Sequence, residues 1–256
     1  MFGQRKYFFS ILYIVMGMFL FLFQPSLMRA GNYTLEGKRA IFVKKFVPEI
    51  IHVNYEIYKE RTRLHILKNS YLHFGELTPS SLKWIKKTAL KYELDTIIVR
   101  QNDIHQLLNK LIERVDIIPV KLVLAQAIIE TGWGRSKAAQ KTNNYFGMTY
   151  RNQSSEGILV TSDSITNYYL ANYSSIRDCI SDYIHNLNTH FAYEEFRRLR
   201  KESRDLCNPL HGVVLSPGLM RYSERKGRYI NKINFVISNY LRSENLIKVF
   251  DSRYIH

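Results

Sequence analysis

The sequence has few of the side chains that build metal clusters. It contains two cysteines, Cys179 and Cys207, and its eight histidines form no HExxH spacing. Two cysteines are too few for a zinc cluster, so we expect no metal site and no cofactor. The two cysteines leave two alternatives open, one disulfide bond or two buried thiols.

Acidic residues are scarce beside basic ones. The chain of 256 residues has 37 Lys and Arg against 22 Asp and Glu, a formal net charge of +15. Such a field attracts polyanions, which include nucleic acid, acidic lipid headgroups and cell-wall polymers. Charge alone does not choose among these partners. A hydrophobic share of 46% is enough for one or two domains with a real core.

Charged residues are missing altogether from one stretch near the start of the chain. Arg5 and Lys6 precede it, and it runs from Tyr7 to Phe23. Its length lies between a signal-peptide core and a full membrane span. A small-x-small cleavage site is absent, because Met28 stands two residues before Ala30. We therefore favour an uncleaved signal anchor over a cleaved signal peptide.

Either interpretation exports the rest of the chain. The expected location is the cell envelope, either anchored in the inner membrane and facing the periplasm or fully exported. The expected partners are then the membrane, through the N-terminal segment, and an anionic wall polymer. Nucleic acid is excluded as a partner by the same argument.

The periodicity of apolar residues after this segment is mainly helical. It predicts a long helix from Phe42 to Leu67 with a kink or break at Pro48, and further helices over Thr78–Tyr92 and Ile104–Arg114. Two short strands, Phe146–Thr149 and Ile158–Tyr169, are expected on either side of a polar turn at Asn152–Gly157. The predicted fold class is α+β, mainly helical, with a small β-hairpin lobe.

One helix carries the candidate chemistry. It begins at Pro119 and is apolar on nearly every side, which predicts burial. Gln126 and Glu130 are its polar exceptions and share one face at i and i+4. Gly132 ends the helix. Burial and the negative end of the helix dipole both raise the pKa of Glu130, which suits the general acid of glycoside hydrolysis. The alternative is a helix-end glutamate that simply reaches solvent.

The residues around Glu130 fit a sugar ligand. Trp133 offers a flat apolar face, and the Asn143–Gly147 segment combines amide groups with two aromatic rings. This mix suits an N-acetylated sugar, although each residue alone is more typical of a turn with a core aromatic. The predicted substrate-binding residues are Gln126, Trp133, Asn144, Tyr145 and Phe146.

These motifs resemble one family. Leu124–Ala127, Glu130–Gly134 and Asn143–Gly147 are similar to the glucosaminidase family of peptidoglycan hydrolases, glycoside hydrolase family 73, in its Bax-like branch. The resemblance covers nearly all of the chain after the N-terminal segment. It implies a lysozyme-like core, cleavage of peptidoglycan glycan strands beside N-acetylglucosamine, Glu130 as general acid and Tyr222 in the active site.

The domain organisation follows from the same reading of the chain. We expect a signal anchor or signal peptide over residues 1–30, a helical region over 31–103 and the catalytic domain over 104–256. The domain boundaries are hypotheses drawn from the sequence.

A second catalytic group is less well defined. Hydrolysis by two carboxyl groups requires a partner for Glu130, and the candidates are Glu156, which we favour, and Asp163. A substrate-assisted route, in which the acetamido group of the sugar attacks, would need only Glu130 and an orienting group such as Tyr222. Two other functions stay open: a muramidase or lytic transglycosylase of the same fold, and a non-catalytic, membrane-anchored glycan-binding protein.

Overall fold

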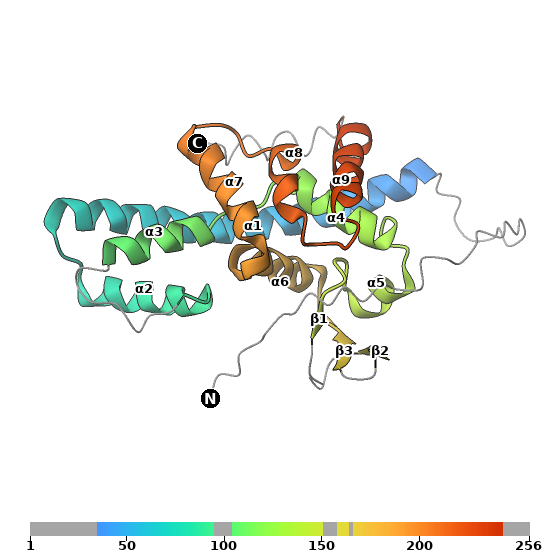
Figure 1. Ribbon diagram of the computed structural model, residues 1–256, viewed down its shortest axis with the longest axis horizontal. Helices are drawn as coiled ribbons and strands as arrows, with labels where there is room; N and C mark the ends of the chain where they lie inside the picture. Colours follow the sequence, from blue (N-terminus) through green and yellow to red (C-terminus); the bar gives the residue numbers. More distant parts are fainter. Residues whose placement is uncertain (1–34, 95–103, 151–157, 164–165, 243–256) are drawn as a thin grey trace, which may run out of the picture.

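The computed structural model describes residues 35–94, 104–150, 158–163 and 166–242, and shows a helical body with a small β lobe (Figure 1). The predicted membrane segment and the turn at Asn152–Gly157 fall outside these residues. No helix in the described part of the chain combines the length and apolar character that a bilayer span requires. The helices are α1 (Leu35–Phe74), α2 (Pro79–Lys91), α3 (Ile104–Arg114), α4 (Val120–Thr131), α5 (Lys137–Thr142), α6 (Ile176–Thr189), α7 (Glu194–Asp205), α8 (Gly212–Leu215) and α9 (Lys226–Tyr240), with two short 3-10 turns, η3 (Phe191–Tyr193) and η4 (Ser216–Leu219).

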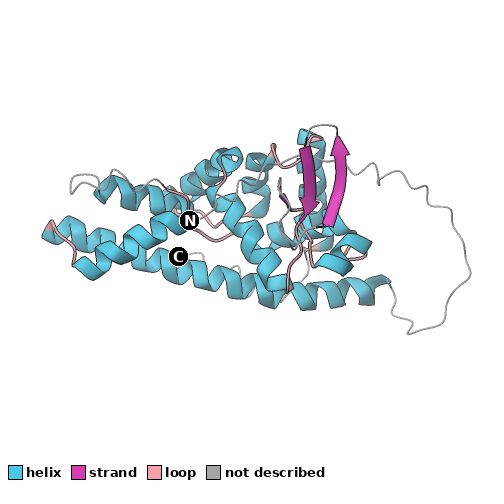
Figure 2. Ribbon diagram, turned by 90° about the horizontal axis from the view of Figure 1, so that it is seen from below, coloured by secondary structure: helices cyan, strands magenta, loops and turns pink. Residues whose placement is uncertain are grey.

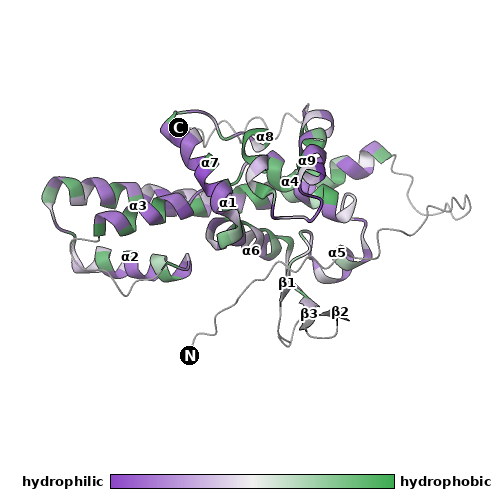
Figure 3. Ribbon diagram, viewed as in Figure 1, coloured by the Kyte–Doolittle hydropathy of each residue, from purple (hydrophilic) through white to green (hydrophobic). Residues whose placement is uncertain are grey.

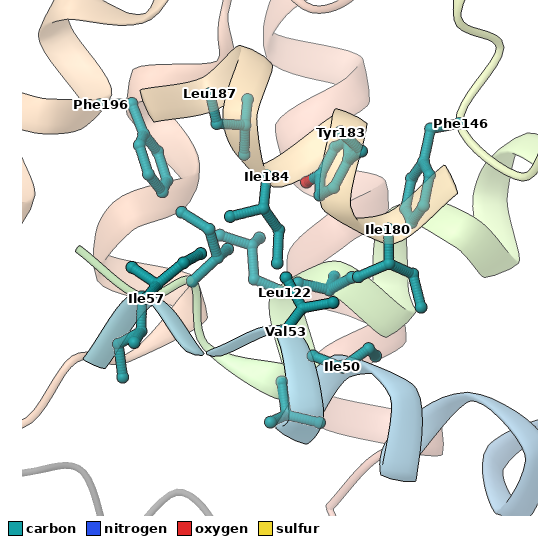
Figure 4. Close-up of a cluster of buried hydrophobic side chains, with 14 of the residues drawn as sticks. Ile50, Val53, Ile57, Leu122, Phe146, Ile180, Tyr183, Ile184, Leu187 and Phe196 are labelled. Carbon is teal, nitrogen blue, oxygen red and sulfur yellow. The ribbon is translucent and has the colours of Figure 1, made fainter. Parts of the chain in front are cut away.

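Helix α1 is the longest element and joins both ends of the molecule. Its 40 residues extend about 60 Å and continue through Pro48, so the predicted break is not present. One stripe of apolar side chains is buried against α3, α4 and α6. Figure 4 shows Ile50, Val53 and Ile57 from this stripe meeting Leu122 of α4 and Ile184 of α6. The N-terminal helix therefore shares one hydrophobic core with the segment that carries the candidate acid.

Several helix ends lie where local sequence signals place them. The Thr78 hydroxyl accepts a hydrogen bond from the backbone N–H of Ser81 at the start of α2, and Ser175 does the same for Asp178 at the start of α6. Gly132 ends α4 with φ 58°, in the left-handed region. Helix α9 begins at Lys226 without a side-chain cap.

The β lobe differs from the predicted hairpin in where the chain turns. Three strands are described, β1 (Thr149–Tyr150), β2 (Ile158–Asp163) and β3 (Thr166–Leu170), in the antiparallel order β1-β3-β2. The expected single strand over Ile158–Tyr169 is thus two strands, which Figure 2 shows side by side in magenta. Phe146 to Met148 form a loop instead of a strand, because the Asn144 side chain hydrogen-bonds both the N–H and the C=O of Met148.

The two cysteines lie in different surroundings and are both free. Cys179 is buried in α6, and Cys207 is exposed after α7. Of the two alternatives that the sequence left open, the structure therefore has no disulfide bond, and only one of the thiols is buried.

Helix α4 lies in the middle of the body and is hydrophobic along its length (Figure 3). Residues Leu122 to Ile128 are all buried, including the polar Gln126. Helix α1 is tied to its start, because Asn54 donates to the carbonyl of Ile118 at 2.8 Å and accepts from the Ile118 N–H. The expectation of a mainly helical α+β chain with a small β lobe is confirmed.

A buried ion cluster fixes the approach to α4. Asp116 is 2% exposed and lies within 4 Å of the guanidinium groups of Arg61, Arg200 and Arg204. Burial alone would raise the pKa of Asp116, but the three arginines hold it below its usual range. Arg200 also donates to Asn188 Oδ1 at 2.7 Å. The cluster thereby connects α1, α6 and α7 to the turn that leads into α4.

Removing the negative charge of this cluster should destabilise the whole fold. We expect Asp116→Asn to lower the free energy of unfolding by about 3 to 5 kcal/mol, because it leaves buried arginines without their counter-charge. Urea denaturation followed by circular dichroism measures this. Asp205→Asn is the matched control, since Asp205 forms an exposed pair with Lys201 at 2.6 Å and should change stability by less than about 1 kcal/mol. Equal effects of the two substitutions would contradict the role of the cluster.

Candidate active site

Glu130 occupies the last turn of α4, where the chain changes direction abruptly. Three consecutive residues after Thr131 have positive φ: Gly132 (58°), Trp133 (67°) and Gly134 (73°). The Thr131 hydroxyl donates to the carbonyl of Ala127 and accepts from the N–H of Gly134 at 2.8 Å. Glycine takes this conformation without strain, whereas Trp133 needs the surrounding contacts to hold it. This turn fixes the position of the glutamate relative to the loop that follows.

The Glu130 side chain combines solvent contact with a crowded environment. The residue is exposed, yet burial raises the pKa of its carboxyl group to about 7 against the hydrogen bond from Tyr229 and the charge of Lys232, which both lower it. A carboxyl group with both properties is surrounded by protein on most sides and open on one. About half of such groups carry a proton at neutral pH, which is the state that a general acid needs.

The best-defined partner of Glu130 is Tyr229, in the first turn of α9. Its hydroxyl donates to Glu130 Oε1 at 2.9 Å and accepts from Gln126 Nε2 at 3.1 Å. No motif in the sequence pointed to Tyr229. It follows Tyr222 by seven residues, but Tyr222 lies before α9 begins, so this spacing does not place the two residues on one helix face.

The other oxygen of Glu130 faces the loop between α5 and β1. Glu130 Oε2 lies 4.0 Å from the position that a Cβ atom would take at Gly147, which is exposed and has a φ of 65°. A glycine at this position keeps the loop in its left-handed conformation next to the carboxyl group. Glu130 Oε2 therefore lies beside an exposed part of this loop.

Aromatic rings form the inner wall of the candidate site. Tyr222 stacks on Tyr229 with ring centroids 5.4 Å apart, and its hydroxyl donates to the carbonyl of Phe146 at 2.7 Å. Phe146 in turn stacks on Tyr183 of α6, with centroids 3.9 Å apart (Figure 4). These contacts join α6, α9 and the Phe146 loop around the carboxyl end of α4.

The predicted substrate-binding residues occupy places that differ from one another. Gln126 has no exposed area and lies behind Tyr229. Asn144 is 3% exposed and uses its amide on the carbonyls of Met148 and Ala171, so it supports the loop. Tyr145 packs edge-on against Phe46 of α1. The three side chains are buried and contact other residues of the protein, and their contact with substrate stays a prediction.

Trp133 is partly buried and packs away from Glu130's hydrogen-bond partners. Its ring lies edge-on to Phe42 and to Tyr240, and the Arg39 guanidinium is 5.3 Å from its centroid. The ring thus connects the end of α4 to the first turns of α1 and to the last residue of α9. Trp133 is only partly buried, and its role in binding a sugar stays a prediction.

The second carboxyl group is not placed. Glu156 lies outside the described residues, and for Asp163 the structure describes only the backbone, in β2. Within the described part of the chain, no group of three or more His, Cys, Asp or Glu side chains could hold a metal ion.

Comparisons with known proteins agree with the resemblance seen in the motifs. The Glucosaminidase family model, described as mannosyl-glycoprotein endo-beta-N-acetylglucosaminidase, matches residues 105–242. Protein bax of Escherichia coli strain K12 is 31% identical over 210 residues, which cover 82% of this chain and 71% of that protein. The solved catalytic domain of the autolysin Auto from Listeria monocytogenes is 18% identical with a TM-score of 0.35, over 86% of this chain and 99% of that one. The chain belongs to the glucosaminidase family of peptidoglycan hydrolases, glycoside hydrolase family 73.

Proposed function

We propose that the protein is an endo-β-N-acetylglucosaminidase that cleaves peptidoglycan glycan strands, with Glu130 as its general acid. The observation that carries the proposal is the Glu130 carboxyl group, whose pKa of about 7 keeps a proton available and whose Oε2 lies beside the exposed Gly147. Its place in the family motif agrees with this role.

The proposed reaction begins with proton transfer from Glu130 to the glycosidic oxygen. The C–O bond to the leaving sugar breaks as that oxygen gains the proton, and Glu130 becomes a carboxylate. The Tyr229 hydroxyl, 2.9 Å from Oε1, then stabilises the new charge by a hydrogen bond that is stronger to the ionised group.

Water completes the cleavage by one of two routes. In the first, Glu156 acts as the second carboxyl group; in the second, the acetamido oxygen of the substrate attacks and water opens the intermediate. Tyr222 is part of the proposed catalytic set, although its hydroxyl is bound to the Phe146 carbonyl in this structure. Full activity in both Glu156→Gln and Asp163→Asn would select the acetamido route.

Replacing Glu130 by its amide should abolish catalysis without removing the fold. We expect Glu130→Gln to lower kcat on purified peptidoglycan by about 100- to 10,000-fold, because an amide cannot donate the required proton. Release of soluble glycan fragments measures the rate. Glu195→Gln, an exposed substitution on α7, is the matched control and should keep parental activity.

The products of the same assay identify the bond that is cut. Mass spectrometry should find reducing N-acetylglucosamine ends. Reducing N-acetylmuramic acid would assign a muramidase, and anhydro-sugar ends would assign a lytic transglycosylase. Wall binding without any released product, unchanged in Glu130→Gln, would assign a glycan-binding protein.

The raised pKa of Glu130 predicts a defined pH dependence. Activity (kcat/KM) should fall as the pH rises through about 7, because the acid loses its proton. The free energy of unfolding should fall as the pH rises from 4.5, the ordinary pKa of a glutamate, to about 7. In this range the folded state holds a proton that the unfolded chain releases.

Thermal unfolding tests the second part of this prediction independently of activity. The melting temperature of Glu130→Gln should rise relative to the parent between pH 5 and pH 8, because the amide escapes the cost of ionising in the site. The same comparison for Glu195→Gln should not change with pH in this interval. A constant difference for Glu130→Gln would contradict the raised pKa.

The proposed location is the cell envelope, with Tyr7–Phe23 holding the chain in the membrane. A peptidoglycan substrate and the uncharged N-terminal run both support it. Full-length protein should remain with membranes after an alkaline wash, and a variant lacking residues 1–30 should be released. Release of both forms would contradict the anchor.

A further inference from the structure

A chain of three hydrogen bonds leads from the core of the protein to Glu130. The Tyr183 hydroxyl donates to Gln126 Oε1, Gln126 Nε2 donates to the Tyr229 oxygen at 3.1 Å, and the Tyr229 hydroxyl donates to Glu130 Oε1 at 2.9 Å. Tyr183 and Gln126 have no exposed area, and Tyr229 is 4% exposed. Helices α6, α4 and α9 each contribute to this chain, so its geometry is set by the packing of the body.

The amide of Gln126 gives the chain a direction. An amide oxygen only accepts hydrogen bonds and an amide nitrogen only donates them. The Tyr183 hydroxyl donates its proton to Gln126 Oε1, so Gln126 Nε2 faces Tyr229. The Tyr229 oxygen then accepts a hydrogen bond from Nε2. The single proton of the Tyr229 hydroxyl lies toward Glu130, because this hydroxyl donates to Oε1. Tyr229 is therefore held as a donor to the carboxyl group.

A fixed donor decides which oxygen of Glu130 carries the acidic proton. A proton on Oε1 would face the proton of Tyr229, so the neutral acid must carry its proton on Oε2. That oxygen lies toward the exposed Gly147. We infer that Gln126 is a positioning residue, which holds the Tyr229 hydroxyl as a donor and thereby keeps the catalytic proton of Glu130 on Oε2. The inference rests on the proposed role of Glu130 as general acid.

The other groups facing Glu130 do not supply this direction. They are Lys232 on α9, Tyr193 in η3 and Tyr222 before α9, in addition to the two tyrosines that form the hydrogen bonds described above. Burial raises the pKa of all four tyrosines well above its usual value, so they are neutral at the pH of the reaction. Lys232 is exposed and lowers the pKa of Glu130 through its charge alone.

A double-mutant cycle tests the inference. Gln126→Met keeps the length of the side chain and removes both hydrogen bonds, and Tyr229→Phe removes only the hydroxyl. We expect each to lower kcat about tenfold with KM within about twofold, since the carboxylate formed by proton transfer loses a directed hydrogen bond. The double variant should match Tyr229→Phe within about twofold, because Gln126 has nothing left to orient.

The ionisation of Glu130 gives a readout that does not depend on catalysis. In carbon-13 NMR titrations of the full-length protein, Tyr229→Phe should raise the pKa of Glu130, because the lost donor favours the charged form. Gln126→Met should raise it by less, and the double variant should match Tyr229→Phe. If Glu130→Gln keeps full activity, the proposed function fails, but this titration still decides whether Gln126 controls the proton.

Matched variants separate positioning from support of the fold. Gln106→Met, on the exposed face of α3, is the control and should change neither kcat nor the titration. Tyr183→Phe retains Gln126 but frees its amide, and should act in the same direction if Gln126→Met does not fold. Two results would overturn the inference: an unchanged pKa and kcat in the Gln126 and Tyr183 variants, or a Gln126→Met loss that is equally large in the Tyr229→Phe background.

Discussion

The hydrogen bond between Tyr229 and Glu130 is the interaction on which the candidate site depends. A carboxyl group among apolar neighbours is unfavourable when ionised, and each cycle of an acid catalyst passes through that ionised state. The Tyr229 hydroxyl, 2.9 Å from Oε1, reduces this cost at the moment when the charge forms. Helix α9 must therefore keep a fixed position against α4, on which it packs.

Local rules made the helix that carries Glu130 predictable from the sequence. An apolar run that starts at Pro119 and ends at Gly132 specifies a buried helix with a left-handed cap, and both are present. The i, i+4 spacing also placed Gln126 on the face of Glu130, where Tyr229 now bridges them. Such features depend on neighbours a few residues apart, so the sequence contains the necessary information.

Contacts between distant parts of the chain were not predictable in the same way. Tyr229 lies 99 positions after Glu130, and no local pattern distinguishes it from the chain's other tyrosines. Trp133 suggested a sugar platform because of its residue type, and the sequence did not show that its ring also packs with Phe42, Tyr240 and Arg39. The bounds of the first predicted strand were wrong for a related reason, since the Asn144 amide holds the Phe146 loop out of the sheet. Side-chain hydrogen bonds determine these features, and the periodicity of apolar residues in the sequence does not reveal them.

The exposure of Glu130 and its raised pKa are consistent with a carboxyl group that protein surrounds on most sides and leaves open on one. A fully enclosed acid could hold its proton but could not reach a glycosidic oxygen, and a fully solvated one would have lost it at neutral pH. A glycan lying toward Gly147 would exclude water from the open side, which strengthens both the retention of the proton and the Tyr229 hydrogen bond. The protein groups on the enclosed side of Glu130 then have to orient the Tyr229 hydrogen bond as well as provide a low dielectric. The buried amide of Gln126 can provide that direction, since it carries no charge that would itself need to be neutralised.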